Sequence, residues 1–412
     1  KNGMKSAQVN TVIEDSYGNI WVGTNEGVHL IGFPAFTHYT ALLGDAVNAI
    51  VEDDSGRIWF GMSGRHQNDM VCLDDQVFRH YSGQGASLKF IQEGVYSLSK
   101  DSGGYLWSGN GDRGTIRFDP HSARPRLTQY DIGEGWNNFL LSILEDAEGR
   151  FWFGTFDGMN HFDGKTMLHY PTPAAPGLDY NLVHSLVEDD DGNIWFGHPQ
   201  YLGRYQDSSF IFYTKNEGLP HNMVHTILKD SRGDLWVGTD GGLSRYNGKT
   251  FSNFTVEDGL NNDRVYSLAE DKLGRIWAGT QNGLAVLVPI EAEKMDTGQD
   301  KQRDFRIYNF GKPDGLKQAD FLFHSVCVDR QNRIWWGKTR GPMMLELDQF
   351  EVPEKLPLVH LDHIEINQEY IDFRQLRDTE YQASSALGRK LRRAFSALTP
   401  FFNYPSHMTL PY

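Results

Sequence analysis

Short alternating strands joined by acidic turns recur along the chain. In the segment VHSLVEDDDGNIWFG, Val183 to Gly197, apolar and polar residues alternate, an acidic turn follows, and a second strand opens with an aliphatic residue and Trp195. Alternation of this kind is typical of a half-buried β-strand, and no apolar period of about 3.6 residues indicates a helix. The segment is therefore predicted to form a β-hairpin.

The hairpin is one copy of a repeat whose anchor is a Trp followed two residues later by a Gly. Eight such pairs occur: Trp21/Gly23, Trp59/Gly61, Trp107/Gly109, Trp152/Gly154, Trp195/Gly197, Trp236/Gly238, Trp277/Gly279 and Trp335/Gly337. Successive tryptophans lie 38, 48, 45, 43, 41, 41 and 58 residues apart. Repeats of about 40 to 45 residues are typical of four-stranded propeller blades. The longest interval holds an insertion, Glu291 to Arg306.

The acidic turn is interpreted as structural. An Asp stands three residues before a Gly at Asp15/Gly18, Asp146/Gly149, Asp189/Gly192, Asp230/Gly233 and Asp271/Gly274. The Asp side chain can accept hydrogen bonds from the backbone amides of the turn, and Gly can adopt the positive φ that the turn requires. In the last repeat Asn332 replaces the Gly, and Asn is the next best residue for that conformation.

A small residue stands ten positions before every Trp. The residues are Thr11, Ala49, Ser97, Ser142, Ser185, Thr226, Ser267 and Ser325. This favours an innermost strand, where blades converge on an axis and large side chains would collide. The Trp row is then predicted to fill the gaps between blades. A third strand within Gly242 to Gly248 and an outer fourth strand within Thr250 to Thr255 complete the unit.

These patterns predict an all-β fold, a single β-propeller of four-stranded blades. Eight blades are expected because eight complete Trp-Gly units are present. Seven blades are the alternative, with the spare unit belonging to a neighbouring propeller. One blade cannot bury both of its faces, so the array must close into a ring.

Charge and cysteine content exclude several classes of partner. The formal net charge of -15 repels phosphate backbones and anionic lipid, so nucleic acid is not expected as a partner. The two cysteines, Cys72 and Cys327, are expected to be free thiols on different blades, and no Cys/His spacing suggests a metal site or cofactor. The chain opens on Lys1 without a leader and contains no run of about 18 apolar residues. We therefore expect a soluble piece of a longer protein, with no direct membrane insertion.

The repeats resemble those of the two-component regulator propeller family. The resemblance covers residues 1 to about 350 and is carried by the acidic turn, the Trp-x-Gly pair and a following Thr-x-x-Gly at Thr24/Gly27, Thr155/Gly158, Thr239/Gly242 and Thr280/Gly283. Repeats 2, 3, 5 and 8 depart from the Thr-x-x-Gly pattern. Residues 351–412, which begin near LPLVHLDHIEINQEYIDF, resemble the start of a Tyr-Tyr-Tyr domain, an immunoglobulin-like β-sandwich that is truncated here. The expected domains are thus a propeller at 1–350 and this segment at 351–412.

The resemblance implies a sensing function without catalysis in this fragment. In the family, such propellers form the periplasmic or extracellular part of bacterial inner-membrane proteins that carry a histidine kinase or another output domain, and glycans or other nutrients are the proposed ligands. The resemblance also implies dimerisation through the parent protein. The alternatives are a protein-interaction or dimerisation platform without a small ligand, and a propeller lyase or hydrolase. Paired carboxylates, an arginine triad or a nucleophile with its base are not evident in the sequence.

Candidate ligand contacts come from the loops that enter the innermost strand and those that join the second strand to the third. Both sets surround the mouth of the axial channel. The candidates are large polar or aromatic residues that break the repeat: Arg65, His66, Arg113, Trp136, His198, Tyr201, His221, Arg264, Lys338 and Arg340. Aromatic rings stack on sugar C–H faces, and charged groups bind hydroxyls or carboxylates. A glycan or another small polar ligand is therefore expected at the mouth.

A second ring of residues stands one position before the small residue. It consists of Asn10, Asn48, Tyr96, Leu141, His184, His225, Tyr266 and His324. The three histidines raise the hypothesis of a metal site. Hydrogen bonding between blades is the simpler interpretation, because equivalent positions on different blades are separated by the channel.

Overall fold

The structure is a computed structural model of the chain. It describes residues 9–14, 20–24, 27–31, 36–39, 42, 45–64, 70–81, 94–111, 114–122, 127–130, 139–172, 181–290, 304–311, 314–316, 319–350, 364–366 and 369–371. The chain divides into two compact units, Lys1–Glu351 and Val352–Tyr412. In the second unit the described residues form two paired strands, β32 (Ile364–Ile366) and β33 (Glu369–Ile371). The expected immunoglobulin-like domain stays a prediction.

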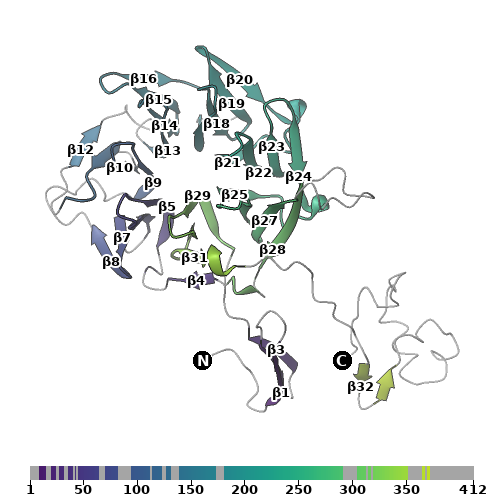
Figure 1. The fold of residues 1–412 in the computed structure, drawn as a ribbon. Coiled ribbons are helices and arrows are strands. Elements are labelled where there is room, and N and C mark those ends of the chain that lie inside the picture. The colour runs from purple at the N-terminus through teal and green to yellow at the C-terminus, as the bar shows by residue number, and fades with distance from the viewer. Residues whose placement is uncertain are drawn as a thin grey trace. The chain divides into compact units, whose positions relative to one another are not determined.

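The first unit contains a ring of seven four-stranded antiparallel blades (Figure 1). Blades 1 to 3 are β5 (Ala46–Glu52), β6 (Ile58–Ser63), β7 (Met70–Asp74) and β8 (Val77–Tyr81); β9 (Val95–Lys100), β10 (Leu106–Asn110), β11 (Thr115–Phe118) and β12 (Leu127–Tyr130); and β13 (Leu140–Glu145), β14 (Phe151–Thr155), β15 (Gly158–Phe162) and β16 (Met167–Tyr170). Blades 4 and 5 are β17 (Ser185–Glu188), β18 (Ile194–His198), β19 (Tyr201–Gln206) and β20 (Ser209–Tyr213), then β21 (Val224–Lys229), β22 (Leu235–Thr239), β23 (Gly242–Tyr246) and β24 (Phe251–Phe254). Blade 6 is β25 (Val265–Glu270), β26 (Ile276–Thr280), β27 (Gly283–Pro289) and β28 (Phe305–Phe310).

Blade 7 closes the ring with strands from both ends of the first unit. Its order is β29 (Phe321–Val328), β30 (Arg333–Lys338), β31 (Met343–Glu346) and then β4 (Phe36–His38), which lies near the start of the chain. After β31 the chain enters a 3-10 turn, Leu347–Gln349, in place of a fourth strand. Two other 3-10 turns, Lys215–Glu217 and Val256–Asp258, follow β20 and β24. The inner strand of each blade contacts the next, and β29 contacts β5.

The expected count of eight blades is wrong, because the first Trp-Gly unit does not contribute a complete blade. Its strands β1 (Val9–Glu14), β2 (Ile20–Thr24) and β3 (Gly27–Ile31) form a separate three-stranded sheet. The strand that follows them, β4, pairs with β31 instead of β3. The outer strand of blade 7 is therefore β4, the segment that would have been the fourth strand of the first repeat. The alternative count of seven is correct.

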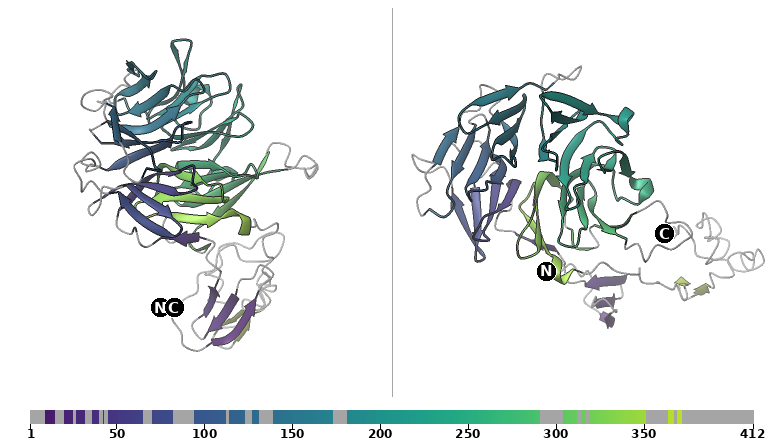
Figure 2. Two further views of the ribbon diagram at one scale, coloured as in Figure 1. Left: turned by 60° about the vertical axis from the view of Figure 1, so that its left-hand side comes forward. Right: turned by 45° about the horizontal axis from the view of Figure 1, so that its top comes forward.

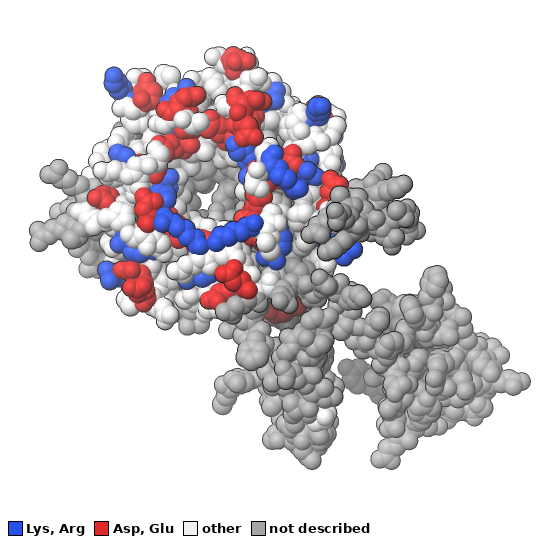
Figure 3. Space-filling view, in the orientation of Figure 1, with Lys and Arg blue, Asp and Glu red and all other residues white. Residues whose placement is uncertain are grey.

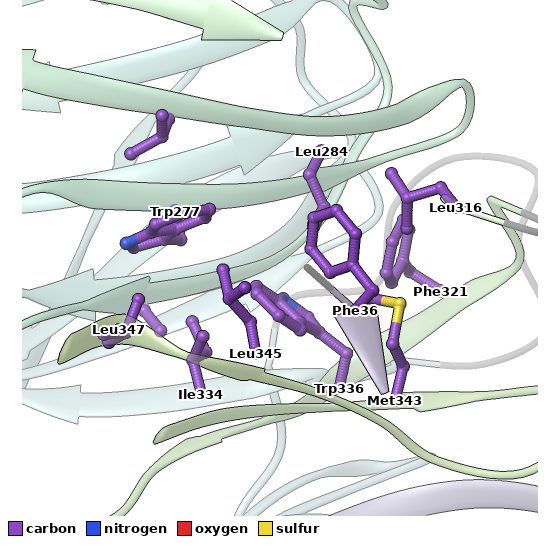
Figure 4. Close-up of a cluster of buried hydrophobic side chains, with 12 residues drawn as sticks. Phe36, Trp277, Leu284, Leu316, Phe321, Ile334, Trp336, Met343, Leu345 and Leu347 are labelled. Carbon is purple, nitrogen blue, oxygen red and sulfur yellow. The ribbon is translucent and has the colours of Figure 1, made fainter. Parts of the chain in front are cut away.

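The described tryptophans of the repeat fill the gaps between blades, as predicted. Trp236 of blade 5 packs with Val265, Leu268 and Ile276 of blade 6. Between blades 6 and 7, Trp277 lies in a cluster with residues of β30 and β31 and with Phe36 from β4 (Figure 4). Six of these side chains are less than 2% exposed: Trp59, Trp107, Trp195, Trp236, Trp277 and Trp335. Each gap is therefore a hydrophobic layer that ties one blade to the next.

Every described acidic turn also anchors the Trp of its own blade. In blade 5, Asp230 accepts hydrogen bonds from the backbone amides of Arg232 and Asp234, and its other oxygen accepts one from Trp236 Nε1 at 2.9 Å. The Asp-to-Trp bond recurs in all seven blades of the ring. Asn332 adopts φ 59° at the predicted left-handed position. The turn is structural, as expected, and its link to the indole is an additional finding.

A second recurring contact joins six of the seven turns of the ring to the next blade. Glu145, Glu188 and Glu270, at the ends of inner strands, accept hydrogen bonds from turn amides of the preceding blade. Where a Lys stands at this place, it pairs with a turn Asp instead: Lys100 with Asp54 and Lys229 with Asp190. Across the closing interface, the backbone amide of Arg330 in the turn of blade 7 donates a hydrogen bond to Glu52 at the end of β5. Polar contacts from blade to blade thus hold the face of the ring that carries the turns. Figure 2 shows the blades in two further views.

The small residue of the inner strand lies opposite the Gly of the Trp-Gly pair. Ser142 pairs directly with Gly154, for example, and a Cβ added to Gly154 would lie 2.6 Å from the carbonyl oxygen of Val183 on the next blade. Both positions are small because the next inner strand lies against them. Cys72 lies on β7 and Cys327 on β29, as predicted, and both thiols are free.

Candidate functional site

The inner strand of blade 7 departs from the geometry of the other blades. Twelve residues before the Trp, the first six blades of the ring carry an aliphatic residue that is fully buried: Val47, Val95, Leu140, Val183, Val224 and Val265. By the same count blade 7 carries Phe323. In the structure, however, Phe321 takes the aliphatic place, because it pairs with Lys338 as Val265 pairs with Thr280. The chain then bulges before it rejoins the ladder.

The bulge in β29 is two residues longer than its counterparts. In blade 6 a single residue, Tyr266, lies between the paired residues Val265 and Ser267. In blade 7 four residues, Leu322 to Ser325, lie between the paired residues Phe321 and Val326 and face only Gly337 on β30, and His324 has φ 54°. A positive φ is uncommon for residues other than Gly, and His is one of the few residue types that adopt it more often.

The bulge projects Phe323 across the inner ends of three other blades. Its ring centroid lies 5.6 Å from that of His184, 4.9 Å from that of His225 and 5.3 Å from that of Tyr266. These residues belong to blades 4, 5 and 6, and Phe323 itself belongs to blade 7. The Phe323 side chain is nevertheless 44% exposed. A large aromatic ring thus lies in the channel, half covered by imidazoles and half open.

The histidines near Phe323 are held neutral. His225 is buried, and its Nε2 lies 2.8 Å from Oδ1 of Asp240. Burial lowers the pKa of His225, opposed by Asp240. Burial lowers the pKa of His184 to about 3, with further lowering by the neighbouring imidazoles, and burial lowers the pKa of His324 to about 4. Buried nitrogens of all three histidines have no hydrogen-bond partner within the described part of the chain.

Hydrogen bonding between blades, expected for this ring of residues, is present at Asn48. Its side-chain amide donates to Ser63 at 2.7 Å and to the carbonyl of Val95 on the next blade at 3.0 Å. The histidines instead form the cluster around Phe323. Among the described residues, no three His, Cys, Asp or Glu side chains are arranged to hold a metal ion. The chemistry that the cluster offers is therefore an apolar ring face beside hydrogen-bonding imidazoles.

Three of the candidate ligand contacts are buried by their own hairpins. His198 and Tyr201 are cross-strand partners at the end of β18 and the start of β19, with their rings stacked at 4.1 Å. Burial lowers the pKa of His198 to about 4 and raises that of Tyr201 to about 12. Lys338 is buried as well, and its Nζ lies 3.1 Å from Asp320. These side chains stabilise the ends of their hairpins.

The other described candidates lie nearer the surface. Arg264 has a side chain that is 51% exposed, and its Nε lies 3.6 Å from Asp240, the partner of His225. His221 accepts a hydrogen bond from the amide of Met223, and Arg340 is exposed. Arg264 is thus brought close to the histidine cluster. The candidates Arg65, His66, Arg113 and Trp136 lie outside the described residues.

Sequence reasoning missed Phe323, although the sequence contains a signal for it. In the aligned repeats of the ring, the position twelve residues before the Trp is aliphatic in six units and aromatic in the seventh. The opening at the centre of the ring is visible in the space-filling view, and on that face Lys and Arg side chains lie along part of its edge (Figure 3). The channel is therefore open to solvent.

Comparison with known proteins assigns the repeats to a family. The sequence profile described as "Two component regulator propeller" matches residues 3–26, 41–64, 133–157, 177–200, 218–241 and 259–282. The chain belongs to the two-component regulator propeller family. No curated protein sequence matches this two-component regulator propeller. Within its described residues, no helix is long and apolar enough to cross a membrane.

Several solved structures share the fold of this two-component regulator propeller. The extracellular domain of a putative hybrid two-component system from B. thetaiotaomicron is 23% identical with a TM-score of 0.65, and the match covers 89% of this chain and 50% of that one. The chain thus spans half the length of that domain. A virginiamycin B lyase from Staphylococcus aureus, solved with quinupristin, is 16% identical with a TM-score of 0.58, covering 76% of this chain and 98% of the lyase. A streptogramin B lyase has a TM-score of 0.57 at 15% identity, over 75% and 96% of the two chains.

Proposed function

We propose that this propeller is the ligand-sensing module of an extracytoplasmic bacterial signal-transduction protein. In this proposal a glycan or another small polar nutrient binds in the channel beside Phe323, and the bound state is passed to a following β domain and to a cytoplasmic output domain. Support comes from membership of the two-component regulator propeller family. The fold shared with the extracellular domain of a putative hybrid two-component system is consistent with it. We propose no catalytic role for the chain.

The observation that carries the proposal is the exposed ring of Phe323. The scaffold requires only a buried aliphatic side chain at the start of each inner strand, and Phe321 already meets that requirement in blade 7. The longer bulge therefore adds an aromatic ring to the channel without adding to the core. A residue that breaks a repeated pattern and exposes an apolar side chain often belongs to a binding site. An exposed ring face next to polar groups suits the C–H face and hydroxyls of a sugar.

The predicted mouth residues have different parts in this proposal. Arg264, His221 and Arg340 are proposed as rim contacts, because they lie at the surface on loops between strands. His198, Tyr201 and Lys338 are buried and are proposed to hold the hairpin ends that shape the mouth. Arg65, His66, Arg113 and Trp136 remain predicted contacts from the sequence.

The test is a binding screen followed by one substitution in the channel. Purified chain is applied to an array of neutral and acidic oligosaccharides, and the best one is titrated calorimetrically into the wild type and Phe323→Ala. We expect Phe323→Ala to weaken binding by roughly tenfold, the loss typical of an aromatic contact at the centre of a site. Its melting temperature should stay within about 1 °C of the wild type, since exposed side chains contribute little to stability.

The matched control is Leu168→Ala on the outer strand β16, because Leu168 is 47% exposed and Phe323 is 44% exposed. This control should bind the oligosaccharide as the wild type does. If no oligosaccharide binds, and substitutions on outer strands abolish signalling by the parent protein while Phe323→Ala does not, the chain is an interaction platform.

A further inference from the structure

The proton on the His225 imidazole has a fixed position. Its Nε2 lies 2.8 Å from a carboxylate oxygen of Asp240. A carboxylate only accepts hydrogen bonds, so Nε2 carries the proton. A neutral imidazole has one N–H, so Nδ1 presents a lone pair. That Nδ1 is buried and has no hydrogen-bond partner within the described residues.

His324 has the same kind of unused acceptor. Its imidazole donates a hydrogen bond to the backbone carbonyl of His225, and a carbonyl likewise only accepts. Its other ring nitrogen, Nε2, therefore carries a lone pair. This atom too is buried without a hydrogen-bond partner in the described part of the chain. Leaving a buried acceptor without a partner is unfavourable. Two such acceptors next to the exposed Phe323 therefore indicate a site that lacks donors.

From these lone pairs we infer that the channel binds an uncharged, hydroxyl-rich ligand, a neutral sugar, whose O–H groups donate to His225 Nδ1 and His324 Nε2. This inference rests on the proposed function and specifies its ligand class. A carboxylate or phosphate ligand offers only acceptor oxygens, which cannot donate a hydrogen bond to His225 Nδ1 or His324 Nε2. The cation nearest to His225 is already paired, because Arg264 Nε lies 3.6 Å from Asp240, which also accepts from His225.

Phe323 controls access to these acceptors. Its ring is stacked on His225 with an interplanar angle of 21°, while the atom Nδ1 of His225 is fully buried. A ligand that reaches the imidazoles must displace the Phe323 ring. The long bulge permits such a movement, since Leu322, Phe323 and His324 make none of the ladder pairings of β29 with β30. The displaced ring can then cover the C–H face of the sugar.

Two substitutions that each keep the donor of the imidazole test the acceptors separately from the fold. His225→Gln keeps a donor near the position of Nε2 for Asp240 but removes the Nδ1 lone pair. His324→Asn keeps a donor near Nδ1, tolerates the positive φ and removes the Nε2 lone pair. Each should weaken binding of the best neutral oligosaccharide by roughly tenfold, as expected for a lost hydrogen bond that leaves a ligand hydroxyl unpaired. His169→Gln is the control, because His169 lies on the outer strand β16.

The pH dependence of binding separates a neutral ligand from an acidic one. The groups that face the imidazoles are Asp240, Arg264, His221, His198 and Tyr266. Burial keeps His184 and His324 neutral down to about pH 4 to 5, because it lowers their pKa to about 3 and about 4. Affinity for a neutral sugar should therefore change by less than about twofold between pH 8 and pH 6. An anion that binds with uptake of one proton would bind roughly tenfold tighter for each unit of lower pH.

Each outcome of these titrations is decisive. Loss of affinity in His225→Gln and His324→Asn, with unchanged melting temperature and flat pH dependence, supports the inference. Preferential binding of uronic-acid oligosaccharides that tightens towards acid pH would overturn it and leave the proposed sensing function intact. Tight binding of a neutral sugar that neither variant affects would do the same. Failure of every oligosaccharide on the array to bind the wild type would overturn both.

Discussion

Replacing Asp230 by Ala should destabilise the propeller strongly, although the residue lies in a turn. Asp230 is 3% exposed, and its carboxylate accepts from Trp236 Nε1 at 2.9 Å and from two backbone amides at 3.0 and 2.9 Å. The indole N–H belongs to a fully buried side chain, so its loss of a partner should cost about 2 kcal/mol. The two amides lie nearer to solvent and should add about 0.5 kcal/mol each. The expected total is about 3 kcal/mol.

The assay is thermal unfolding followed by circular dichroism at constant pH and protein concentration. A loss of about 3 kcal/mol should lower Tm by roughly 6 °C, taking about 2 °C per kcal/mol for a large domain. The matched control is Asp234→Ala in the same turn, which removes a partly exposed ion pair with Arg245 and should cost less than about 1 kcal/mol. Equal effects of the two substitutions, or a change below 1 °C in Asp230→Ala, would refute the role given to the Asp-to-Trp hydrogen bond.

Three further outcomes follow from the packing and the buried titratable groups. Gly154→Ala should destabilise the propeller by about 2 to 3 kcal/mol, because the new Cβ would lie 2.6 Å from the carbonyl oxygen of Val183. A urea titration that gives wild-type stability for this variant would refute the close approach of the blades. Tm should fall between pH 6.5 and pH 5. The pKa in the folded chain is about 3 for His184 and about 4 for His198 and His324, below the value of about 6.5 in the unfolded chain. As the pH falls, the unfolded chain therefore takes up protons first and is favoured. A Tm that is constant over this range would contradict the buried neutral imidazoles. Cys72 is buried and Cys327 is half-buried, and burial raises both pKa values to about 12. Both thiols should therefore react with a disulfide reagent at pH 8 far more slowly in the folded chain than after unfolding, and equal rates would contradict the raised pKa values.

The blade could be predicted from the sequence because each position of the repeat has a local cause. The acidic turn, the left-handed Asn332, the small residue opposite the Gly and the Trp between blades all recur where the sequence places them. The number of blades could not be counted from the Trp residues. Ring closure depends on which segments pair, and β4 pairs with β31, whose sequence lies some 300 residues away. No local pattern specifies that pairing.

The candidate site was predicted less well, for a physical reason. Alignment on Trp335 places Phe323 at a core position and His324 in the ring with His225. A bulge two residues longer moves Phe321 into the core and releases Phe323 into the channel. The histidine ring was recognised in the sequence, but its members were expected to be separated by the channel. Phe323 bridges that separation, and an alignment without gaps cannot show it.

The measurement that tests the central claim most directly is amide hydrogen exchange with and without the oligosaccharide selected on the array. If the ligand binds beside Phe323 and displaces its ring, the amides of residues 321–326 and those around His225 and Tyr266 should change their exchange rates by at least about threefold, while the acidic turns on the opposite face keep theirs. Protection confined to those turns or to the outer strands, with residues 321–326 unchanged, would contradict the channel as the sensing site.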